Sequence, residues 1–351
     1  MSVISVIMAG GVGSRFFPLS TDKKPKQFLN LFSDNPMISD TFERILPIIP
    51  KEDILISTNS NFVPLVLDAI PDAKESQCVK EPCGRNTAPA LGLIALLASK
   101  KAKDCVVVSL HSDHHITKES KFLSVIQSAI EVAKDKNIVT LGIEPSYPET
   151  GYGYIQANQT TLNEFGKHDY HKVNAFKEKP DLETAKSYIK SGNYYWNSGM
   201  FIFRADHMLE EMKTHCNELY QGLMNLEQYI GDLDSPEFIK AYSNLTKISI
   251  DVAVMERSQD VSVIPCEIGW SDVGSYLSLH KLKDKDKNQN ALIGDNPLQT
   301  IDASNNLIVS EFAGKRIGIL SVKDLMIIDS KDFLLIGDIN SSQLVKEFIE
   351  D

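Results

Sequence analysis

A glycine-rich loop near the start of the chain carries the residue types that bind phosphate. The segment from Ala9 to Arg15 reads Ala-Gly-Gly-Val-Gly-Ser-Arg, and Lys26 follows in a Pro-Lys-Gln sequence. Glycine lets backbone N–H groups come close to an anion, and arginine and lysine add full positive charge. An ordinary tight turn after a strand is the alternative interpretation. The two cationic side chains favour a phosphate site.

The loop matches neither of the two common phosphate-binding motifs. A P-loop requires G-x-x-x-x-G-K-[ST], and no glycine of the loop has the required glycine and lysine downstream. The dinucleotide fingerprint G-x-G-x-x-G would begin at Gly11 and Gly13, but Phe16 stands at its third glycine position. The loop therefore predicts a nucleotide site of another kind.

Two downstream segments carry groups that suit a nucleotide and a metal ion. Segment 81–90 predicts a rigid turn into a helix with Thr87 as its N-cap, and free N–H groups there suit a base edge or a phosphate. A capped helix start without a ligand is the alternative. Asp113 follows an apolar run, and its carboxylate suits Mg²⁺, which takes oxygen ligands. A turn or helix cap is its alternative role, and a zinc site with His114 and His115 would lack further ligands.

Four further segments combine glycine with aromatic, amide and carboxylate residues, which suits a polyhydroxylated ligand. They are residues 149–154, 176–180, 196–200 and 269–275. Within them, Lys179 suits a second phosphate, and Asp272 would complete a metal site with Asp113. The lysines of segment 176–180 could equally be solvated charges before a helix.

The elements that must position these groups alternate between short apolar runs and helical patterns. This alternation predicts an α/β fold with a doubly wound, mostly parallel sheet. Strands are expected over 3–8, 54–57, 105–110, 138–143, 199–203 and 261–264, and helices over 87–101 and 121–134. Ligands bind at the carboxyl ends of the strands of such sheets, where both the glycine loop and Asp113 fall.

The pattern changes after residue 281. A charged, polar linker over 282–290 separates an expected catalytic domain, 1–281, from a small C-terminal domain, 291–351. Brief apolar runs over 307–309, 317–322, 325–328 and 333–336 predict a β-helix-like stack, closed by a helix over 342–350. This domain suits a homodimer interface and a stabilising cap equally well.

Composition excludes several classes of function. The chain has 351 residues, 42% of them hydrophobic, which is typical of a globular protein. Its net charge of −11 argues against binding to nucleic acid. Five cysteines without a C-x-x-C pair fit a reducing cytoplasm, and no apolar run reaches membrane-spanning length. We therefore expect a cytoplasmic enzyme without a membrane or nucleic-acid partner.

In their order and spacing, the motifs resemble those of the mannose-1-phosphate guanylyltransferases, which are sugar-nucleotide pyrophosphorylases. The resemblance covers about residues 1–280. It implies a Rossmann-like nucleotide-diphosphosugar transferase fold and Mg²⁺ as cofactor. It also implies that GTP and mannose 1-phosphate are converted to GDP-mannose and diphosphate.

The resemblance also implies a role for each matching residue. Nucleotide binding is expected from Ala9, Gly10, Gly11, Gly13, Arg15, Lys26, Arg85, Asn86, Thr87 and Asp113. Sugar-phosphate binding is expected from Gly151, Glu178, Lys179 and Asn197. Asp113 and Asp272 are the expected metal ligands, and catalysis is assigned to Arg15, Lys26, Asp113, Lys179 and Asp272.

The chain departs from the family pattern at three positions, and three rival functions stand beside the one that the resemblance implies. Relatives usually carry Leu-Trp where this chain has Phe16 and Phe17, and proline where it has His111. Longer relatives append an isomerase domain, for which the sequence beyond residue 280 has no room, so isomerase activity is not expected. The rivals are a nucleotidyltransferase for another hexose or heptose 1-phosphate and a non-catalytic sugar-nucleotide sensor. A nicotinamide dehydrogenase is disfavoured by Phe16.

Overall fold

The structure, a computed structural model, describes residues 1–165 and 168–349, with the side chains of 159–165 left undescribed. The chain divides into two compact units. Unit 1 comprises residues 1–10, 41–112, 116–165 and 168–270, and unit 2 comprises 11–40, 113–115 and 271–349. A separate domain over 291–351 stays a prediction. In the structure, residues 291–349 share unit 2 with the glycine loop.

Unit 1 is built on a sheet that has nine strands in the described part of the chain, in the order β3-β2-β1-β4-β9-β6-β10-β8-β7. Its strands are β1 (Val3–Ala9), β2 (Ile54–Asn59), β3 (Cys78–Glu81), β4 (Val106–His111), β6 (Ile138–Ile143), β7 (Gly153–Phe165), β8 (His168–Glu178), β9 (Tyr194–Arg204) and β10 (Val261–Cys266). β1, β2, β3 and β4 run parallel, as do β6 and β10. The predicted α/β class and its Rossmann-like sheet are confirmed.

The sheet is less uniformly parallel than the apolar pattern suggests. β9 lies antiparallel between β4 and β6, and β7 and β8 form an antiparallel pair at the edge of the sheet. A strand buried on both faces shows the same apolar run whichever way it points, so the sequence pattern does not report direction. β7 and β8 carry mixed polar residues, and no strand was predicted over them for that reason.

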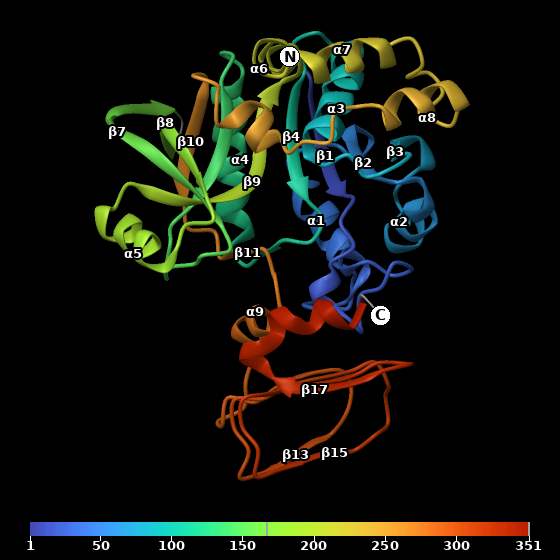
Figure 1. The fold of residues 1–351 in the computed structure, drawn as a ribbon, viewed down its shortest axis with the longest axis vertical. Helices are drawn as coiled ribbons and strands as arrows, with labels where there is room; N and C mark the ends of the chain where they lie inside the picture. The colour runs from blue at the N-terminus through green and yellow to red at the C-terminus, as the bar shows by residue number, and fades with distance from the viewer. Residues whose placement is uncertain (166–167, 350–351) are drawn as a thin grey trace. The chain divides into compact units, whose positions relative to one another are not determined.

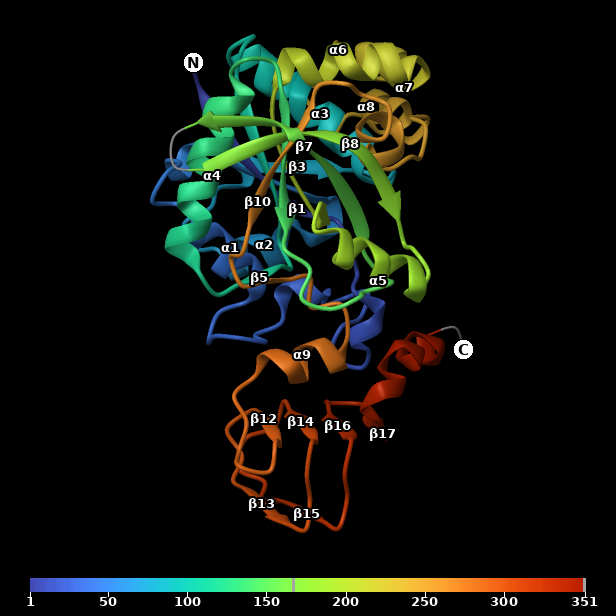
Figure 2. The same ribbon diagram turned by 90° about the vertical axis from the view of Figure 1, so that its left-hand side faces the viewer.

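Helices cover both faces of this sheet (Figures 1 and 2). α3 (Thr87–Lys101) packs against α6 (Ala205–His215) and α7 (Asn217–Leu226), and α7 packs on α8 (Pro236–Ser243). α4 (Glu119–Ala133) contacts β4, β6 and β9, and Figure 2 shows it on the other side of the sheet from α3. The remaining helical elements in and beside unit 1 are α1 (Met37–Ile45), η3 (Lys51–Asp53), η4 (Ser60–Phe62), α2 (Val63–Ala69), η5 (Glu75–Gln77), α5 (Leu182–Ser191) and the π-helix η6 (Asp251–Met255).

The core of unit 1 explains the composition of α3. Ten of its residues are buried, among them Leu91, Leu93, Ile94 and Leu96. They pack against apolar residues of α6, α7 and the sheet in one large cluster. A helix that is apolar on nearly all sides belongs inside a protein, which fixes where its N-terminus, and with it segment 81–90, must lie.

Unit 2 combines the glycine loop with a stack of short strands. The loop contains η1 (Ser14–Phe16) and η2 (Lys26–Phe28). β12 (Ala291–Ile293), β14 (Leu307–Ser310) and β16 (Leu325–Asp329) pair in parallel, β17 (Leu334–Asp338) closes that sheet antiparallel to β16, and β13 (Leu298–Ile301) pairs in parallel with β15 (Ile317–Leu320). Figure 2 shows β12, β14 and β16 side by side. This arrangement confirms the predicted small β domain with a β-helix-like stack.

Buried asparagines help to hold the turns of the stack in register. The side-chain amide of Asn306 donates to Asn290 Oδ1 at 2.8 Å, and Asn306 Oδ1 accepts from the backbone N–H of Leu325 at 2.9 Å. Both asparagines are buried. Buried amides that bond from one turn to the next satisfy polar groups that would otherwise destabilise the stack.

One local prediction was wrong. The N-cap of α3 is Asn86, whose Oδ1 accepts from the N–H of Thr87, and Thr87 is the first helical residue. The closing segment is a helix of the 3₁₀ type, η7 (Ile339–Ile349), which begins three residues before the helix expected over 342–350, and residue 350 lies outside the described residues. Serine, asparagine and threonine all cap helices, so composition does not choose between neighbours. Before η7, α9 (Tyr276–Leu282) ends at the start of the predicted linker.

Short strands lie where the chain passes between the units, namely β5 (His115–Ile116) and β11 (Trp270–Ser271). Within the described residues, no helix combines the length and the apolar character needed to cross a membrane.

Candidate active site

The glycine loop of unit 2 is packed tightly against Lys26. Gly13 has φ +76°, and a Cβ built on it would lie 2.4 Å from the Cβ of Lys26. Its carbonyl oxygen accepts from the hydroxyl of Ser20, and the N–H of Lys26 donates to the carbonyl of Val12 at 3.1 Å. Only glycine combines this backbone conformation with this close approach. The requirement for Gly13 is therefore both conformational and steric.

Lys26 joins the two aspartates that were expected to bind metal. Its Nζ lies 2.9 Å from Asp113 Oδ2 and donates to the carbonyl oxygens of Asp113 at 3.2 Å and of Asp272 at 2.7 Å. The residue is only 4% exposed, and its ammonium lies 5.5 Å from the centre of the Phe16 ring. An ammonium has three N–H donors, so these three oxygens use all of them. The lysine that sequence reasoning assigned to phosphate thus contacts the carboxylate of Asp113 and the backbone of both aspartates.

Gly274 brings Arg15 into the same group. A Cβ on Gly274 would lie 2.9 Å from Asp272 Oδ2 and 3.4 Å from Arg15 Nη1. The carboxylate of Asp272 and the guanidinium of Arg15 therefore both border the same glycine. Unit 2 thus collects two cationic and two anionic side chains beside one glycine loop. Four catalytic residues chosen from the sequence, separated by up to 257 positions, meet here.

Of the two histidines in the zinc interpretation, His114 has a ligand atom within 4.8 Å of one on Asp113, whereas the geometry of His115 gives that interpretation no support. Its ring stacks on the ring of Phe32, with 3.8 Å between ring centres and 13° between ring planes. An imidazole held flat on an aromatic ring serves packing.

In unit 1, segment 81–90 turns into the N-terminus of α3. Asn86 adopts φ +70° and caps the helix, and the hydroxyl of Thr87 accepts from the N–H of Ile250 at 2.8 Å. The Nε of Arg85 is buried and has no hydrogen-bond partner among the described residues. A buried guanidinium donor without a partner points to an anionic or carbonyl group of a ligand, which agrees with the expected nucleotide contact.

Glu81, the first residue of segment 81–90, is held by two buried hydrogen bonds. Its carboxylate oxygens accept from the hydroxyls of Ser57 and Tyr242, each at 2.8 Å. Burial raises the pKa of Glu81 above its usual range, and the two hydrogen bonds oppose that shift only in part. Sequence reasoning included Glu81 in the motif without a role, and the structure gives it a structural one.

The residues expected to bind the sugar phosphate converge in unit 1 at Gly153. A Cβ there would lie 2.8 Å from Glu178 Oε2 and 3.5 Å from the Cβ of Asn197. The absence of a side chain at Gly153 therefore lets the carboxylate of Glu178 and the side chain of Asn197 approach the same point of the backbone, and carboxylate and amide groups bind sugar hydroxyls well. Gly151 lies just upstream, where its N–H donates to Glu149 Oε1 at 2.8 Å.

Asp251, which sequence reasoning missed, orients Asn197. The amide nitrogen of Asn197 donates to Asp251 Oδ1 at 2.8 Å, and its amide oxygen accepts from the N–H of Gly199 at 3.0 Å. Burial raises the pKa of Asp251, the Asn197 hydrogen bond lowers it, and the charge of Glu178 raises it further. Asp251 lies in the π-helix η6, an element often found at functional sites. Its sequence neighbourhood, Ser-Ile-Asp-Val-Ala, carried no motif that would have identified it.

Lys179 and His111 complete this region of unit 1. The Lys179 ammonium donates to Glu178 Oε1 at 2.7 Å, and its side chain is 64% exposed. His111 Nε2 lies 3.1 Å from the carbonyl oxygen of Gly199. A Cβ on Gly199 would lie 2.7 Å from the same nitrogen, and Gly199 has φ +69°. His111, which stands where the family pattern has proline, therefore packs against segment 196–200, which contains Asn197.

Comparisons with known proteins identify the family of the chain. The family model described as "Nucleotidyl transferase" matches residues 4–289. Mannose-1-phosphate guanylyltransferase 2 of Escherichia coli O157:H7 is 38% identical over 357 residues, which cover 99% of this chain and 73% of that protein. The mannose-1-phosphate guanylyltransferase of Salmonella montevideo is 39% identical over the same shares of both chains.

The chain belongs to the mannose-1-phosphate guanylyltransferase family of nucleotidyl transferases. A solved structure titled as the mannose-1-phosphate geranyltransferase from Thermus thermophilus matches it with a TM-score of 0.89 and 28% identity, over 100% of this chain and 99% of that one. The resemblance inferred from the motifs, the fold class and the assignment as a nucleotidyltransferase enzyme are confirmed. The individual site residues stay predictions.

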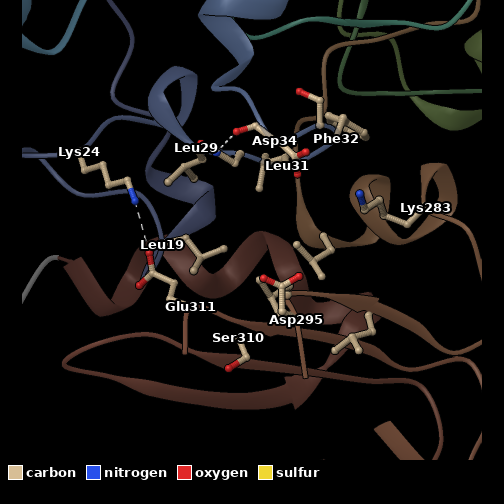
Figure 3. Close-up of a pocket in the computed structure, with 16 residues that line it drawn as sticks. Leu19, Lys24, Leu29, Leu31, Phe32, Asp34, Lys283, Asp295, Ser310 and Glu311 are labelled. Carbon is tan, nitrogen blue, oxygen red and sulfur yellow. Dashed lines mark hydrogen bonds and ion pairs between the residues drawn. The ribbon is translucent and has the colours of Figure 1, made fainter. Parts of the chain in front are cut away.

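A pocket of about 540 Å³ lies within unit 2 but does not coincide with this guanylyltransferase-type site (Figure 3). It is bordered by apolar residues of the glycine-loop segment, such as Leu29, and by residues of the strand stack, such as Asp295 and Glu311. Lys24 Nζ lies 3.4 Å from Glu311 Oε1 across it. Of the residues that the structure describes, those around the pocket include none of the predicted site residues. The candidate active site is therefore identified by its residue types and their contacts, and not by the size of a pocket.

Proposed function

We propose that this chain transfers the guanylyl group of GTP to mannose 1-phosphate, which yields GDP-mannose and diphosphate. The observation that carries the proposal is the arrangement around Lys26, which holds Asp113 and Asp272 beside the glycine loop and Arg15. Paired carboxylates beside two cations and a glycine loop suit the handling of a triphosphate. The choice of a guanine nucleotide and of mannose 1-phosphate as substrates rests on the names of the mannose-1-phosphate guanylyltransferases that the chain resembles.

The glycine loop and the cations serve the nucleotide. Backbone N–H groups near Gly11 and Gly13 would donate to phosphate oxygens, and Arg15 would stabilise the charge that develops on the departing diphosphate. Among described residues, a Cβ on Gly11 would have no neighbour within 4 Å, which leaves room for a phosphate. Arg85, with its unpartnered Nε, would contribute a further contact to the nucleotide.

The donor set at Asp113 and Asp272 fits Mg²⁺. Carboxylate oxygens are the ligands of a hard divalent cation, and Lys26 fixes the positions of both residues. When bound there, the cation would neutralise phosphate charge and act as a Lewis acid toward the α-phosphate. The contacts of Lys26 hold the Asp113 carboxylate directly and Asp272 through its backbone carbonyl.

The sugar phosphate is assigned to the convergence at Gly153. Glu178 and Asn197 would accept from and donate to mannose hydroxyls, and Asp251 fixes the orientation of the Asn197 amide. Lys179 would release Glu178 and pair with the sugar phosphate, because its side chain is exposed and carries a mobile ammonium.

The reaction needs orientation and charge compensation more than proton transfer. A phosphate oxygen of mannose 1-phosphate forms a bond to the α-phosphorus of GTP, and the bond from that phosphorus to the bridging oxygen breaks. The electron pair leaves with diphosphate, so phosphorus keeps its oxidation state. The nucleophile is already an anion, and no general base is required. Holding two anions together is the main task of the site.

A panel of nucleoside triphosphates and sugar 1-phosphates, assayed for diphosphate release with Mg²⁺, tests the proposal. We expect the highest kcat/KM for GTP with mannose 1-phosphate. A clear preference for another hexose or heptose 1-phosphate, or for another nucleotide, would replace this function by the related one. Tight binding of GDP-mannose without turnover would instead identify a sensor.

A further inference from the structure

A second cluster of ligand-type side chains lies in unit 1, on α6 and just before β10. It consists of His207, Glu211 and Asp260, whose ligand atoms all lie within 4.8 Å of one another. His207 and Glu211 are four residues apart on one face of the helix, and Asp260 directly precedes β10. Figure 1 shows α6 and the start of β10 at the same end of unit 1.

This cluster is remote from the strand ends used by the candidate active site. Arg204, which precedes α6, pairs with Val106 at the beginning of β4, and Val261 pairs with Ile138 at the beginning of β6. The glycine loop, in contrast, follows the carboxyl end of β1, and His111 ends β4. Within unit 1, the cluster therefore lies by the beginnings of the strands, whereas His111 lies at the carboxyl end of β4.

His207 is buried and lacks the hydrogen bonds that a buried imidazole normally makes. It is 3% exposed, and neither ring nitrogen has a hydrogen-bond partner among the described residues. Glu211 Oε2 is buried and unpartnered by the same criterion, although His215 Nε2 lies 3.3 Å from it. Buried polar atoms without partners are rare, and a bound ion is one of the few explanations.

The two nitrogens of His207 face different carboxylates. Nε2 lies 3.7 Å from Asp260 Oδ2, and Nδ1 lies 3.9 Å from Glu210 Oε2. Both distances exceed a hydrogen bond. Ligand atoms around a tetrahedral zinc ion, with bonds of about 2.0–2.1 Å, lie roughly 3.4 Å apart, so Nε2 and Oδ2 are close to the separation of two ligands of one ion.

We propose that His207 Nε2, Glu211 and Asp260 form a structural binding site for a divalent transition-metal ion of the zinc type. Imidazole nitrogen with carboxylate oxygen favours such ions over Mg²⁺. Glu210 would accept from the second ring nitrogen, as outer carboxylates do around metal-bound histidines, and it is itself held by Lys136 at 3.0 Å. The ion would link α6 to the entry of β10. This proposal is independent of the proposed function.

The test is Zn²⁺ binding to chelator-treated protein, by competition with a chromophoric chelator, with excess Mg²⁺ present to occupy the carboxylates of the glycine-loop site. We expect one tight Zn²⁺ per chain. Loss of an outer-shell partner typically weakens metal binding by about 10–100-fold, and loss of a direct ligand should weaken it at least as much. We therefore expect His207→Gln and Asp260→Asn each to weaken Zn²⁺ binding by at least that factor.

Asp260→Asn guards against a folding artefact, because the Asp260 side chain is 51% exposed and the change conserves its shape. Asp68→Asn, on the exposed face of α2, is the matched control and should bind Zn²⁺ like the wild type. Zn²⁺ should also raise the Tm of the wild type and of Asp68→Asn but not of the two ligand variants. Equal Zn²⁺ stoichiometry and affinity in wild type and Asp260→Asn would overturn the proposal and leave His207 and Asp260 as a simple ion pair.

Discussion

Replacing Gly13 by alanine should reduce turnover by displacing Lys26. A Cβ at position 13 would lie 2.4 Å from the Cβ of Lys26, and ordinary contact begins at 3.4 Å, so the two must separate by 3.4 − 2.4 = 1.0 Å. The clash involves the root of the lysine side chain, which cannot turn away. Lys26 donates hydrogen bonds to both Asp113 and Asp272, so a shift of Lys26 would move both residues. A misplacement of about 1 Å at a catalytic group lowers rates by about 10²-fold.

The assay is diphosphate release from GTP and mannose 1-phosphate under saturating substrate and Mg²⁺. Gly192→Ala is the matched control, because Gly192 has a similar φ of +72° and no described atom within 4 Å of its would-be Cβ. Both variants carry the strain of a left-handed alanine, about 1–2 kcal/mol, and both should lower Tm. Only Gly13→Ala should lose kcat. A Gly13→Ala enzyme with kcat within about threefold of wild type would refute the role given to Lys26, since a tenfold loss corresponds to only about 1.4 kcal/mol.

Three further predictions concern single carboxylates. Asp113→Asn should lower kcat by about 10²–10³-fold at fixed Mg²⁺, and near-normal turnover would remove Asp113 from the metal site. Asp251→Ala frees the Asn197 amide, so KM for mannose 1-phosphate should rise about 2–12-fold, the equivalent of one hydrogen bond of about 0.5–1.5 kcal/mol, with less effect on KM for GTP. An unchanged KM would contradict the positioning role. Burial raises the folded-state pKa of Glu81 above its unfolded value of 4.5, so the wild type loses stability as pH rises from the unfolded pKa to the folded pKa. In urea unfolding, the stability of Glu81→Gln relative to wild type should therefore improve from pH 4.5 upward. Parallel pH profiles of the two proteins would contradict a raised pKa for Glu81.

The sequence indicates candidate site residues where their type suits phosphate or a metal ion. Arg15, Lys26, Asp113 and Asp272 were chosen from motifs and lie together in unit 2, while their roles stay predictions. The partners of Lys26 were not foreseen, because no local pattern tells whether an ammonium faces a ligand or a neighbouring carbonyl.

Long-range contacts account for what was missed. Asp251 contacts Asn197 across 54 positions of sequence, and its own neighbourhood is ordinary for a helix. The antiparallel direction of β9 was missed for a similar reason, because its apolar run looks like that of any central strand. Tertiary pairing, not local composition, decides both features.

The bond between Lys26 and Asp272 has a consequence for the order in which the protein folds. It joins residues 246 positions apart, and closing so long a loop carries an entropic cost that grows with the logarithm of its length. Tyr276 adds a second closure, since its hydroxyl donates to the carbonyl of Phe16 at 2.8 Å. During synthesis the glycine loop emerges long before Asp272 and Tyr276, so until they are made only its local bonds and its contacts with Asp113 can hold it. A chain ending before Ser271 would therefore keep those contacts but lack the bonds to Asp272 and Tyr276.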